Sequence, residues 1–338
     1  MHIPDGYLSP QTCAVMYAAA LPFWYVAAQR VKKTLSARMV PLIAIFSAFS
    51  FVIMMFNVPL PGGTTGHAVG GTVMAIVLGP WATVIGVSIA LAVQALFFGD
   101  GGLLAFGANA FNMAIVLPFV AYTVYRVISG NTPVTSSRRV IAAGIAGFAA
   151  INAAAFCAAV EFGIQPALFH TADGTPLYGP YGLSTAIPAM MLGHILIAGP
   201  VEGIVTALVV AYLQRANLPI LELNEPKMQA APGGKLATGP LWIALAILAV
   251  LSPLGLLAAG TAWGEWGAAE LQTLTGSLPA GLDRLGSLWS APLPDYAPPF
   301  LASATVGYIL SALLGMGLVV VLVMVVGRRL AKKDTVGD

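Results

Sequence analysis

Most of the chain alternates between apolar stretches of roughly 20 residues and short segments that contain Gly, Pro or charged side chains. About 20 helical residues cross the hydrocarbon core of a bilayer, and a helix satisfies its own backbone hydrogen bonds there. The pattern therefore predicts an all-α, polytopic membrane protein. Its nine expected spans are residues 8–30, 39–57, 67–79, 81–98, 103–128, 139–161, 183–213, 240–260 and 302–326.

The third expected span is short, and Gly66 and the Gly79-Pro80 pair bound it. Two interpretations are open. In one, the chain crosses the membrane nine times. In the other it crosses seven times, because residues 67–98 enter and leave from the same side as a re-entrant pair. We favour nine crossings, and both interpretations place the two ends of the chain on opposite sides.

The composition excludes a soluble domain. Hydrophobic residues make up 58% of the chain and charged residues 8%, and the mean hydropathy is +0.87. A single core cannot bury so much apolar surface, so lipid must cover the rest. Cys13 and Cys157 both lie in apolar runs, and we expect no disulfide framework.

The positive charges predict an orientation in a cell membrane. With the N-terminus outside and the C-terminus inside, 14 of the 15 Lys and Arg residues are cytoplasmic and only Arg284 is outside, as the positive-inside rule requires. No positive residue precedes the first apolar stretch, so we expect a retained helix rather than a cleaved signal peptide. The cytoplasmic cations are Arg30, Lys32, Lys33, Arg38, Arg126, Arg138, Arg139, Arg215, Lys227, Lys235, Arg328, Arg329, Lys332 and Lys333.

The first residues of the chain can chelate a metal ion. The α-amine of Met1, the backbone amide of His2 and the His2 imidazole close two fused rings on one ion, and Pro4 stiffens the chain beyond them. This set requires His as the second residue and a free Met1 amine. We expect Met1 to be retained, because removal of the initiator generally needs a small second residue.

A second imidazole is expected on the same face. His67 lies in the glycine-rich segment 61–71, at the outer mouth of the third span. Together with the N-terminal atoms it makes four nitrogens, a square-planar set typical of Ni(II) or Cu(II), with Co(II) also open. The alternative is that His2 is an interfacial residue and that His67 only bonds the backbone.

Polar residues in the expected spans allow two interpretations. Gln94, Asn109 and Asn112 can orient the metal ligands through hydrogen bonds, or they can join helices to one another. His194 and Glu202 lie eight residues apart on one helix face. They are candidates for an ion-coupled secondary carrier, or they satisfy backbone groups beside the Gly199-Pro200 kink.

The outer loops are expected to carry most of the acidic side chains, which would attract cations. His170 and Asp173 share one of these loops, either as a weak cation collector or as solvated residues. The outer carboxylates are Asp5, Asp100, Glu161, Asp173, Glu265, Glu270, Asp283 and Asp295.

Motifs and composition also divide the chain. It contains no GxxxxGK[ST], GxSxG or HExxH motif, so we expect a transporter subunit rather than an enzyme, with energy supplied by a partner. The Pro- and Gly-containing segment 216–238 is expected to be a cytoplasmic linker. It would join a seven-helix module, residues 1–215, to a two-helix module, residues 239–338, whose helices are connected by an outer loop over 261–301.

Four segments resemble the CbiM/NikM family: MHIPDGYLSP at the start, PGGTTGHAVGG (61–71), GANAFNM (107–113) and GHILIAGPVEGIVTA (193–207). These proteins are the cobalt- or nickel-binding membrane subunits of energy-coupling factor transporters. The resemblance covers roughly residues 1–215. The tail, with SPLGLLA, AWGEW and APLPDY, is similar to the small NikN/PDGLE-like accessory subunit, although the PDGLE string itself is absent.

The resemblance implies a function and partners. It implies uptake of Ni²⁺ or Co²⁺, which links such proteins to cobalamin biosynthesis, with the ion as substrate and no cofactor. It implies that Met1, His2 and His67 hold the ion. It also implies a complex in the inner membrane with a coupling subunit and two cytoplasmic ABC-type ATPases. Which of the two metals is the substrate is left open.

Overall fold

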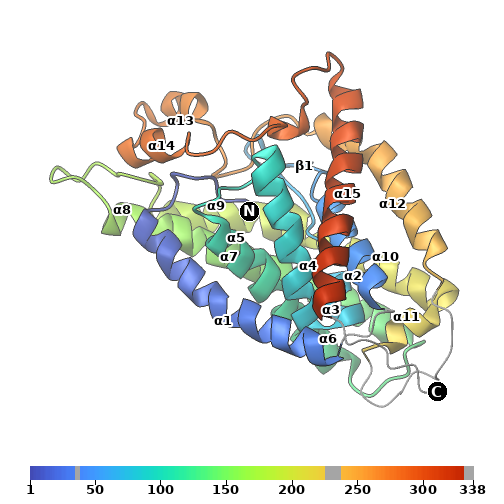
Figure 1. Ribbon diagram of the computed structural model, residues 1–338. Coiled ribbons are helices and arrows are strands. Elements are labelled where there is room, and N and C mark those ends of the chain that lie inside the picture. The colour runs from blue at the N-terminus through green and yellow to red at the C-terminus, as the bar shows by residue number, and fades with distance from the viewer. Residues whose placement is uncertain (35–38, 225–236, 331–338) are drawn as a thin grey trace.

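The computed structural model describes residues 1–34, 39–224 and 237–330 (Figure 1). These residues are almost all helical, apart from loops and one two-stranded antiparallel hairpin, which confirms the all-α prediction. The part up to residue 224 contains, in order, α1 (Pro10–Thr34), α2 (Val40–Ile53), β1 (Val58–Leu60), β2 (Thr64–Gly66), α3 (Gly71–Leu78), α4 (Pro80–Val93), η2 (Gln94–Phe98), α5 (Phe106–Asn109), η3 (Ala110–Val116), α6 (Leu117–Ser129), α7 (Ser137–Gly163), α8 (Gln165–Leu168), α9 (Leu183–Gly193), η4 (His194–Ala198), α10 (Gly199–Ala216) and α11 (Leu218–Glu222).

The C-terminal part adds two long apolar helices and a connection between them. Helices α12 and α15 stand beside the bundle, and the short helices α13 and α14 lie at the end of the molecule where the chain begins (Figure 1). The elements are α12 (Gly239–Leu251), η5 (Ser252–Leu257), α13 (Ala268–Thr275), α14 (Ala280–Leu285), η6 (Pro294–Tyr296) and α15 (Ala304–Leu330).

Six helical segments of the described chain are long and apolar enough to cross a membrane. Helix α1 has 25 residues but is less apolar, and α2 has only 14. The protein is thus a multi-pass membrane protein, as the composition predicts, while nine crossings stay a prediction. The six segments are Pro80–Phe98, Phe106–Ser129, Ser137–Leu168, Leu183–Ala216, Gly239–Leu257 and Ala304–Leu330.

The third expected span differs from the prediction. Its helix, α3, has only eight residues and is therefore about 12 Å long at 1.5 Å per residue, against a hydrocarbon core of about 30 Å. All eight residues are buried. The apolar residues of this run are therefore buried inside the protein. A helix as short as α3 fits the re-entrant interpretation of residues 67–98.

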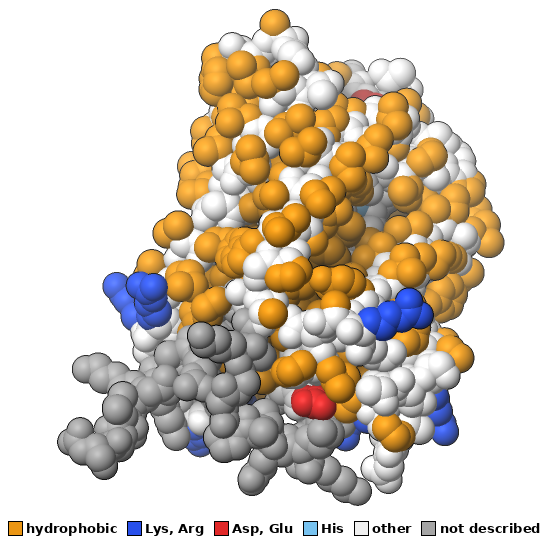
Figure 2. Space-filling view, turned by 90° about the vertical axis from the view of Figure 1, so that its right-hand side faces the viewer, with side chains coloured by type: hydrophobic (Ala, Val, Ile, Leu, Met, Phe, Trp, Pro, Cys, Tyr) orange, Lys and Arg blue, Asp and Glu red, His pale blue; other side chains and the backbone are white. Residues whose placement is uncertain are grey.

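Apolar side chains cover most of the face shown in Figure 2, and Lys and Arg side chains lie in the lower half of the view. This separation agrees with a membrane-embedded body, whereas the side on which each end lies stays a prediction. Arg38, Lys227, Lys235, Lys332, Lys333 and most of the expected linker lie outside the described residues.

The start of the chain is buried. Ile3, Tyr7, Leu8 and Ser9 each expose 2% or less of their surface. Buried backbone groups need hydrogen-bond partners, and loops supply them: Gly102 N–H donates to Ile3 O, and Gly179 N–H donates to Tyr7 O, each at 2.8 Å. The first nine residues are therefore part of the folded interior.

Helix α15 joins the C-terminal part to the bundle along α2. Gly315 of α15 lies against the ring of Phe51, with no room for a Cβ atom. Nearby, the Tyr308 hydroxyl donates to Met55 O at 3.0 Å. The small residue at position 315 therefore sets how closely the two helices approach.

We predict that Gly315→Ala lowers the stability of this packing by about 1–3 kcal/mol, because the added methyl group meets Phe51. Thermal unfolding of the purified protein in detergent measures the effect. Gly317→Ala is the matched control, since no atom of the described part of the chain lies within 4 Å of its added methyl group. Equal melting temperatures for the two variants would contradict the close approach of α15 and α2.

Candidate metal centre

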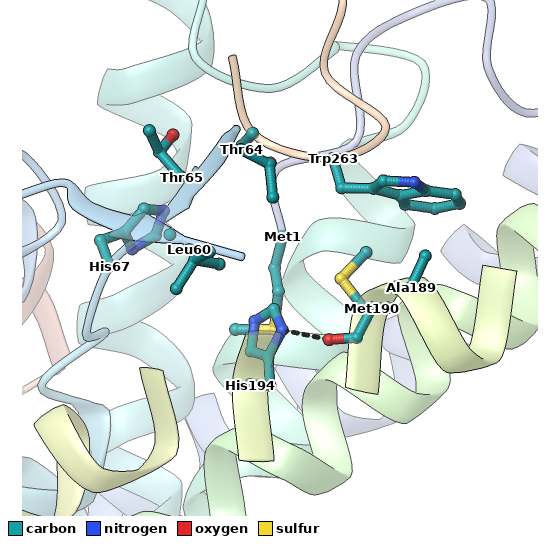
Figure 3. Close-up of a pocket in the computed structure, with 11 residues that line it drawn as sticks. Met1, Leu60, Thr64, Thr65, His67, Ala189, Met190, His194 and Trp263 are labelled. Carbon is teal, nitrogen blue, oxygen red and sulfur yellow. Dashed lines mark hydrogen bonds between the residues drawn. The ribbon is translucent and has the colours of Figure 1, made fainter. Parts of the chain in front are cut away.

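His67 follows strand β2 directly, in the loop that leads into α3. Its Nδ1 lies 3.1 Å from Ala68 O. A carbonyl can only accept, so Nδ1 carries the proton and Nε2 keeps its lone pair. Burial holds the pKa of His67 well below its ordinary value, and the ring is neutral at pH 7. His67 lines a small cavity together with Met1, Met190 and His194 (Figure 3).

Glu202 of α10 holds the loop that carries His67. Its Oε2 accepts from Val69 N–H at 2.7 Å and from Gly70 N–H at 3.0 Å. These amides precede the first turn of α3, where a negative charge also interacts favourably with the helix dipole. Glu202 therefore bonds backbone groups, as the structural interpretation expects, but these groups belong to the loop before α3 and not to the Gly199-Pro200 kink.

Asn109 at the end of α5 fixes the residue that follows His2. Its Oδ1 accepts from Ile3 N–H at 2.7 Å, and its Nδ2 donates to Ile3 O at 3.1 Å. One side chain thus holds both polar groups of a single buried residue. Two residues farther on, the Asp5 carboxylate accepts from the backbone N–H groups of Leu103 and Ala105. The backbone that carries His2 is fixed on both sides of Pro4.

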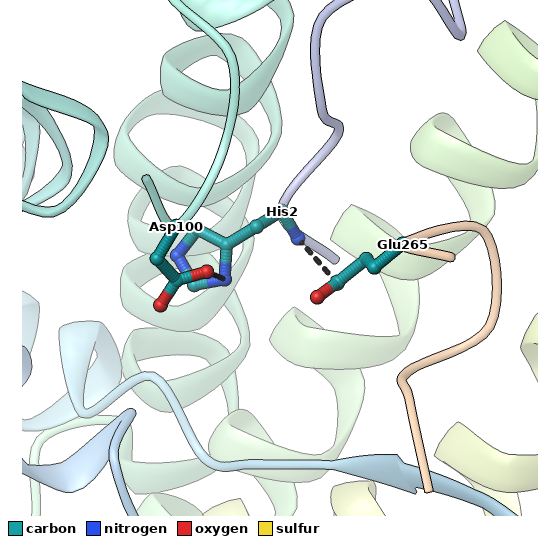
Figure 4. Close-up of side chains that lie close together, drawn as sticks. All are labelled: His2, Asp100 and Glu265. Atoms are coloured by element: carbon teal, nitrogen blue, oxygen red, sulfur yellow. Dashed lines mark hydrogen bonds and ion pairs between the residues drawn. The ribbon is translucent and has the colours of Figure 1, made fainter. Parts of the chain in front are cut away.

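The three nitrogens of the predicted N-terminal chelate all lie next to carboxylate oxygens, and Figure 4 shows the two that belong to His2. The Met1 amine and the His2 N–H both donate to Oε1 of Glu265, at 2.8 and 2.9 Å. His2 Nδ1 lies 3.1 Å from Oδ1 of Asp100 without forming a hydrogen bond. The structure therefore brings the three nitrogens to one small region that also contains two carboxyl groups.

Gln94, the first residue of η2, sets the tautomer of His2. Its Oε1 lies 3.3 Å from His2 Nε2, while its Nε2 donates to the Tyr296 hydroxyl at 3.1 Å. An amide oxygen can only accept, so His2 Nε2 carries the proton. Burial lowers the pKa of His2 to about 4, which leaves the ring neutral at pH 7, with a lone pair on Nδ1. This is the atom that the chelate needs.

The predicted ligands come together. The His2 and His67 ring centroids are 5.1 Å apart, and both side chains are buried. Gln94 and Asn109 both contact the N-terminal segment, as expected if they orient the predicted metal ligands. Asn112 differs: its Nδ2 donates to Glu161 of α7 at 2.8 Å, so its contact joins two helices rather than orienting a ligand.

The remaining candidate histidines are bonded to the backbone. His194 Nδ1 lies 2.8 Å from Met190 O, one helical turn earlier. Its ring lines the cavity next to His67, whereas Glu202 is engaged with the α3 loop. His170 lies in an exposed loop with its Nδ1 2.9 Å from Thr171 O. These contacts fit the structural interpretation of both residues.

Sequence reasoning did not single out Asp100 and Glu265 as site residues. Both were among the carboxylates expected in outer loops. Their expected location on the same side of the membrane as the N-terminus was the only sequence signal that could have linked them to the site. Glu265 is 264 positions from Met1, so no local spacing reveals the contact. Within the described chain, Asp100, Glu265 and His2 have ligand atoms that all lie within 4.8 Å of one another.

The fold defines a helical membrane protein that brings the predicted metal ligands together at one end, and comparison with known proteins shows its family. The model of the family described as "Cobalt uptake substrate-specific transmembrane region" matches residues 2–219, and that of the PDGLE domain matches residues 239–332. The chain belongs to this cobalt-uptake family and carries a C-terminal PDGLE domain. The predicted family resemblance is confirmed for both parts.

A relative and two solved structures show how similar the chain is to known transporters. It is 54% identical to the fused nickel transport protein NikMN of Rhodobacter capsulatus, over 95% of each chain. A crystal structure of a truncated transition metal transporter shares 57% identity with a TM-score of 0.60, covering 64% of this chain and 99% of that one. A second transition metal transporter structure shares 58% identity at the same TM-score, covering 64% and 93%.

These similarities identify the protein as a membrane component of nickel and cobalt transport rather than an enzyme. The predicted class is thereby confirmed.

We predict that Asn109→Ala loosens the N-terminal segment, because it removes two buried hydrogen bonds to Ile3. Losing about 1–2 kcal/mol of local stability would raise amide hydrogen exchange at Ile3 by roughly 5- to 30-fold. Asn152→Ala is the control, since the Asn152 amide donates to Phe148 O within its own helix. Unchanged exchange at Ile3 in Asn109→Ala would show that these two hydrogen bonds do not hold the N-terminal segment in place.

Proposed function

We propose that this protein captures Ni²⁺ or Co²⁺ with four nitrogens: the Met1 amine, the His2 amide, His2 Nδ1 and a His67 ring nitrogen. The observation that carries the proposal is the burial of the first two residues beside His67, with His2 in the tautomer that leaves Nδ1 its lone pair. Four nitrogens suit a square-planar ion, which favours Ni(II). The name of the Rhodobacter capsulatus relative also points to nickel.

Binding requires the site to release protons. An amine and an amide must each lose a proton before they can bind a metal ion, whereas His67 and His2 are already neutral at pH 7. In the structure both N–H groups donate to Glu265. A metal ion bound to both nitrogens would lie on the side that the Glu265 oxygen faces, so that side chain must exchange its hydrogen bonds for a contact with the ion or with water.

We further propose that the protein works as the substrate-binding subunit of an ATP-driven energy-coupling factor transporter. Its sequence has no P-loop motif, so ATP hydrolysis would belong to two cytoplasmic ATPases joined through a membrane coupling subunit. An ion-coupled secondary carrier using His194 and Glu202 has less support, because both side chains bond the backbone. Uptake that persists in cells lacking the ATPases would favour that alternative.

We predict that one Gly added before Met1 abolishes tight binding, because the amine then leaves the chelate. Calorimetric titration of Ni²⁺ and Co²⁺ into the purified protein measures the change, and a loss of at least about 100-fold in affinity is expected for the lost amine ligand and the chelate ring that it closes. One Gly added after Asp338 is the matched control. Equal affinity in the two variants would mean that the amine is not a ligand.

We predict that affinity for Ni²⁺ falls as the pH is lowered from 8 to 6, because the amine and the amide release protons on binding. With two protons released, the change approaches about 100-fold per pH unit. The His2 imidazole does not contribute in this range, since its pKa is lowered to about 4. Titrations at pH 8, 7 and 6 test this, and a constant affinity would rule out ligation by the amine.

A further inference from the structure

Two carboxylates and one imidazole meet at the mouth of the proposed chelate. Ligand atoms of Asp100, Glu265 and His2 lie within 4.8 Å of one another, and they come from three distant segments of the chain. The Asp100 and Glu265 side chains are 19% and 17% exposed, whereas the His2 side chain is 2% exposed. The carboxylates therefore stand between the buried nitrogens and the surface.

One atom in this cluster points to a cation. His2 Nδ1 is buried and has no hydrogen-bond partner among the described residues, although Asp100 Oδ1 lies only 3.1 Å away. Because His2 Nε2–H donates to Oε1 of Gln94, Nδ1 carries no proton and its lone pair faces a carboxylate oxygen. Two electron-rich atoms at this distance repel one another, and a cation held by both removes the repulsion.

Asp100 is held in place for such a role. Its Oδ2 accepts from the Tyr296 hydroxyl at 2.6 Å, which leaves Oδ1 facing His2. Tyr296 comes from η6 in the C-terminal part, so that part positions Asp100 as well as supplying Glu265.

A cavity reaches the two carboxylates of this cluster. It has a volume of about 340 Å³ and is lined by His67, Asp100, Glu265, Asp295 and Tyr296, among others. A hydrated divalent cation carries a shell of oxygen ligands, and carboxylates replace water in such a shell readily. The cavity thus offers a hydrated ion a polar, acidic approach to the cluster.

We propose that Asp100, Glu265 and His2 Nδ1 form a capture site, at which a divalent transition-metal ion binds before it passes to the four-nitrogen chelate. This proposal rests on the proposed function. His2 Nδ1 is shared by both sites, so the ion keeps one ligand as it moves. Glu265 turns from the two N–H groups to the ion, the amine and the amide release their protons to water, and the nitrogens then replace the carboxylate oxygens.

A ligand used only on the way to the final site speeds entry and exit alike. We expect Glu265→Gln to slow both association and dissociation of Ni²⁺ by about tenfold, with an equilibrium affinity within about threefold of the original, because the amide oxygen still accepts from both N–H groups. Asp100→Asn should behave in the same way. Stopped-flow mixing with Ni²⁺, and with a chelator for dissociation, measures both rates.

The control is Glu270→Gln, which makes the same change of charge in the same loop. Glu270 is exposed, and it accepts a hydrogen bond from the Thr261 hydroxyl at 2.8 Å, whereas the Met1 and His2 N–H groups donate to Glu265. Its rates should match those of the unaltered protein. Equal slowing in Glu265→Gln and Glu270→Gln would overturn the capture site, because general attraction of cations would then explain both.

Two further outcomes separate this proposal from the proposed function. If Glu265→Gln and Asp100→Asn keep the original rates, and binding remains tight and sensitive to a Gly before Met1, the capture site is wrong and the chelate stands. Slower association with unchanged dissociation also overturns the capture site, since the carboxylates would then belong to the final complex. If the unaltered protein shows no binding that depends on a free Met1, the proposed function itself fails.

Discussion

Everything at the candidate metal centre depends on the burial of the start of the chain. A charged amine and a run of backbone polar groups inside a protein cost several kcal/mol unless each finds a partner. Here Glu265 serves Met1 and His2, Asn109 serves both polar groups of Ile3, and Asp5 bonds the loop at Leu103 and Ala105. The same contacts that make burial tolerable also hold His2 beside His67.

Three irregular helical segments lie where polar side chains are needed. The π-helices η2 and η4 begin at Gln94 and His194, and η3 follows Asn109 directly. A π-turn inserts one extra residue and changes the direction of the side chains near it, and such turns are frequent at functional sites. In this protein they bring amides and an imidazole from apolar helices to the end of the bundle where the chain begins.

The two parts of the chain share one polar centre. The N-terminal part contributes the nitrogens, whereas the loops between α12 and α15 contribute Glu265 and Tyr296. Helix α15 packs closely on α2 through Gly315, and the Tyr7 hydroxyl donates to Trp266 O at 2.7 Å. The PDGLE domain is thus in contact with the N-terminal residues themselves as well as with the outside of the bundle.

Much of the protein's character followed from sequence alone. Apolar runs of helical length identify a multi-pass helical membrane protein. The thickness of the bilayer sets the length of a spanning helix, and a helix satisfies its own backbone hydrogen bonds within the hydrocarbon core. The N-terminal motif and the segment around His67 led to the correct family. Such signals are local, so they can be seen without knowing which segments meet.

The tertiary structure decided the rest. It showed that the apolar run at 67–79 contains a short buried helix, that Glu202 bonds the α3 loop and that Asn109 rather than Asn112 contacts the chelating segment. It also placed Glu265 on the Met1 amine. Hydropathy cannot separate a helix buried in protein from one buried in lipid, and a contact between residues hundreds of positions apart depends on how the helices pack.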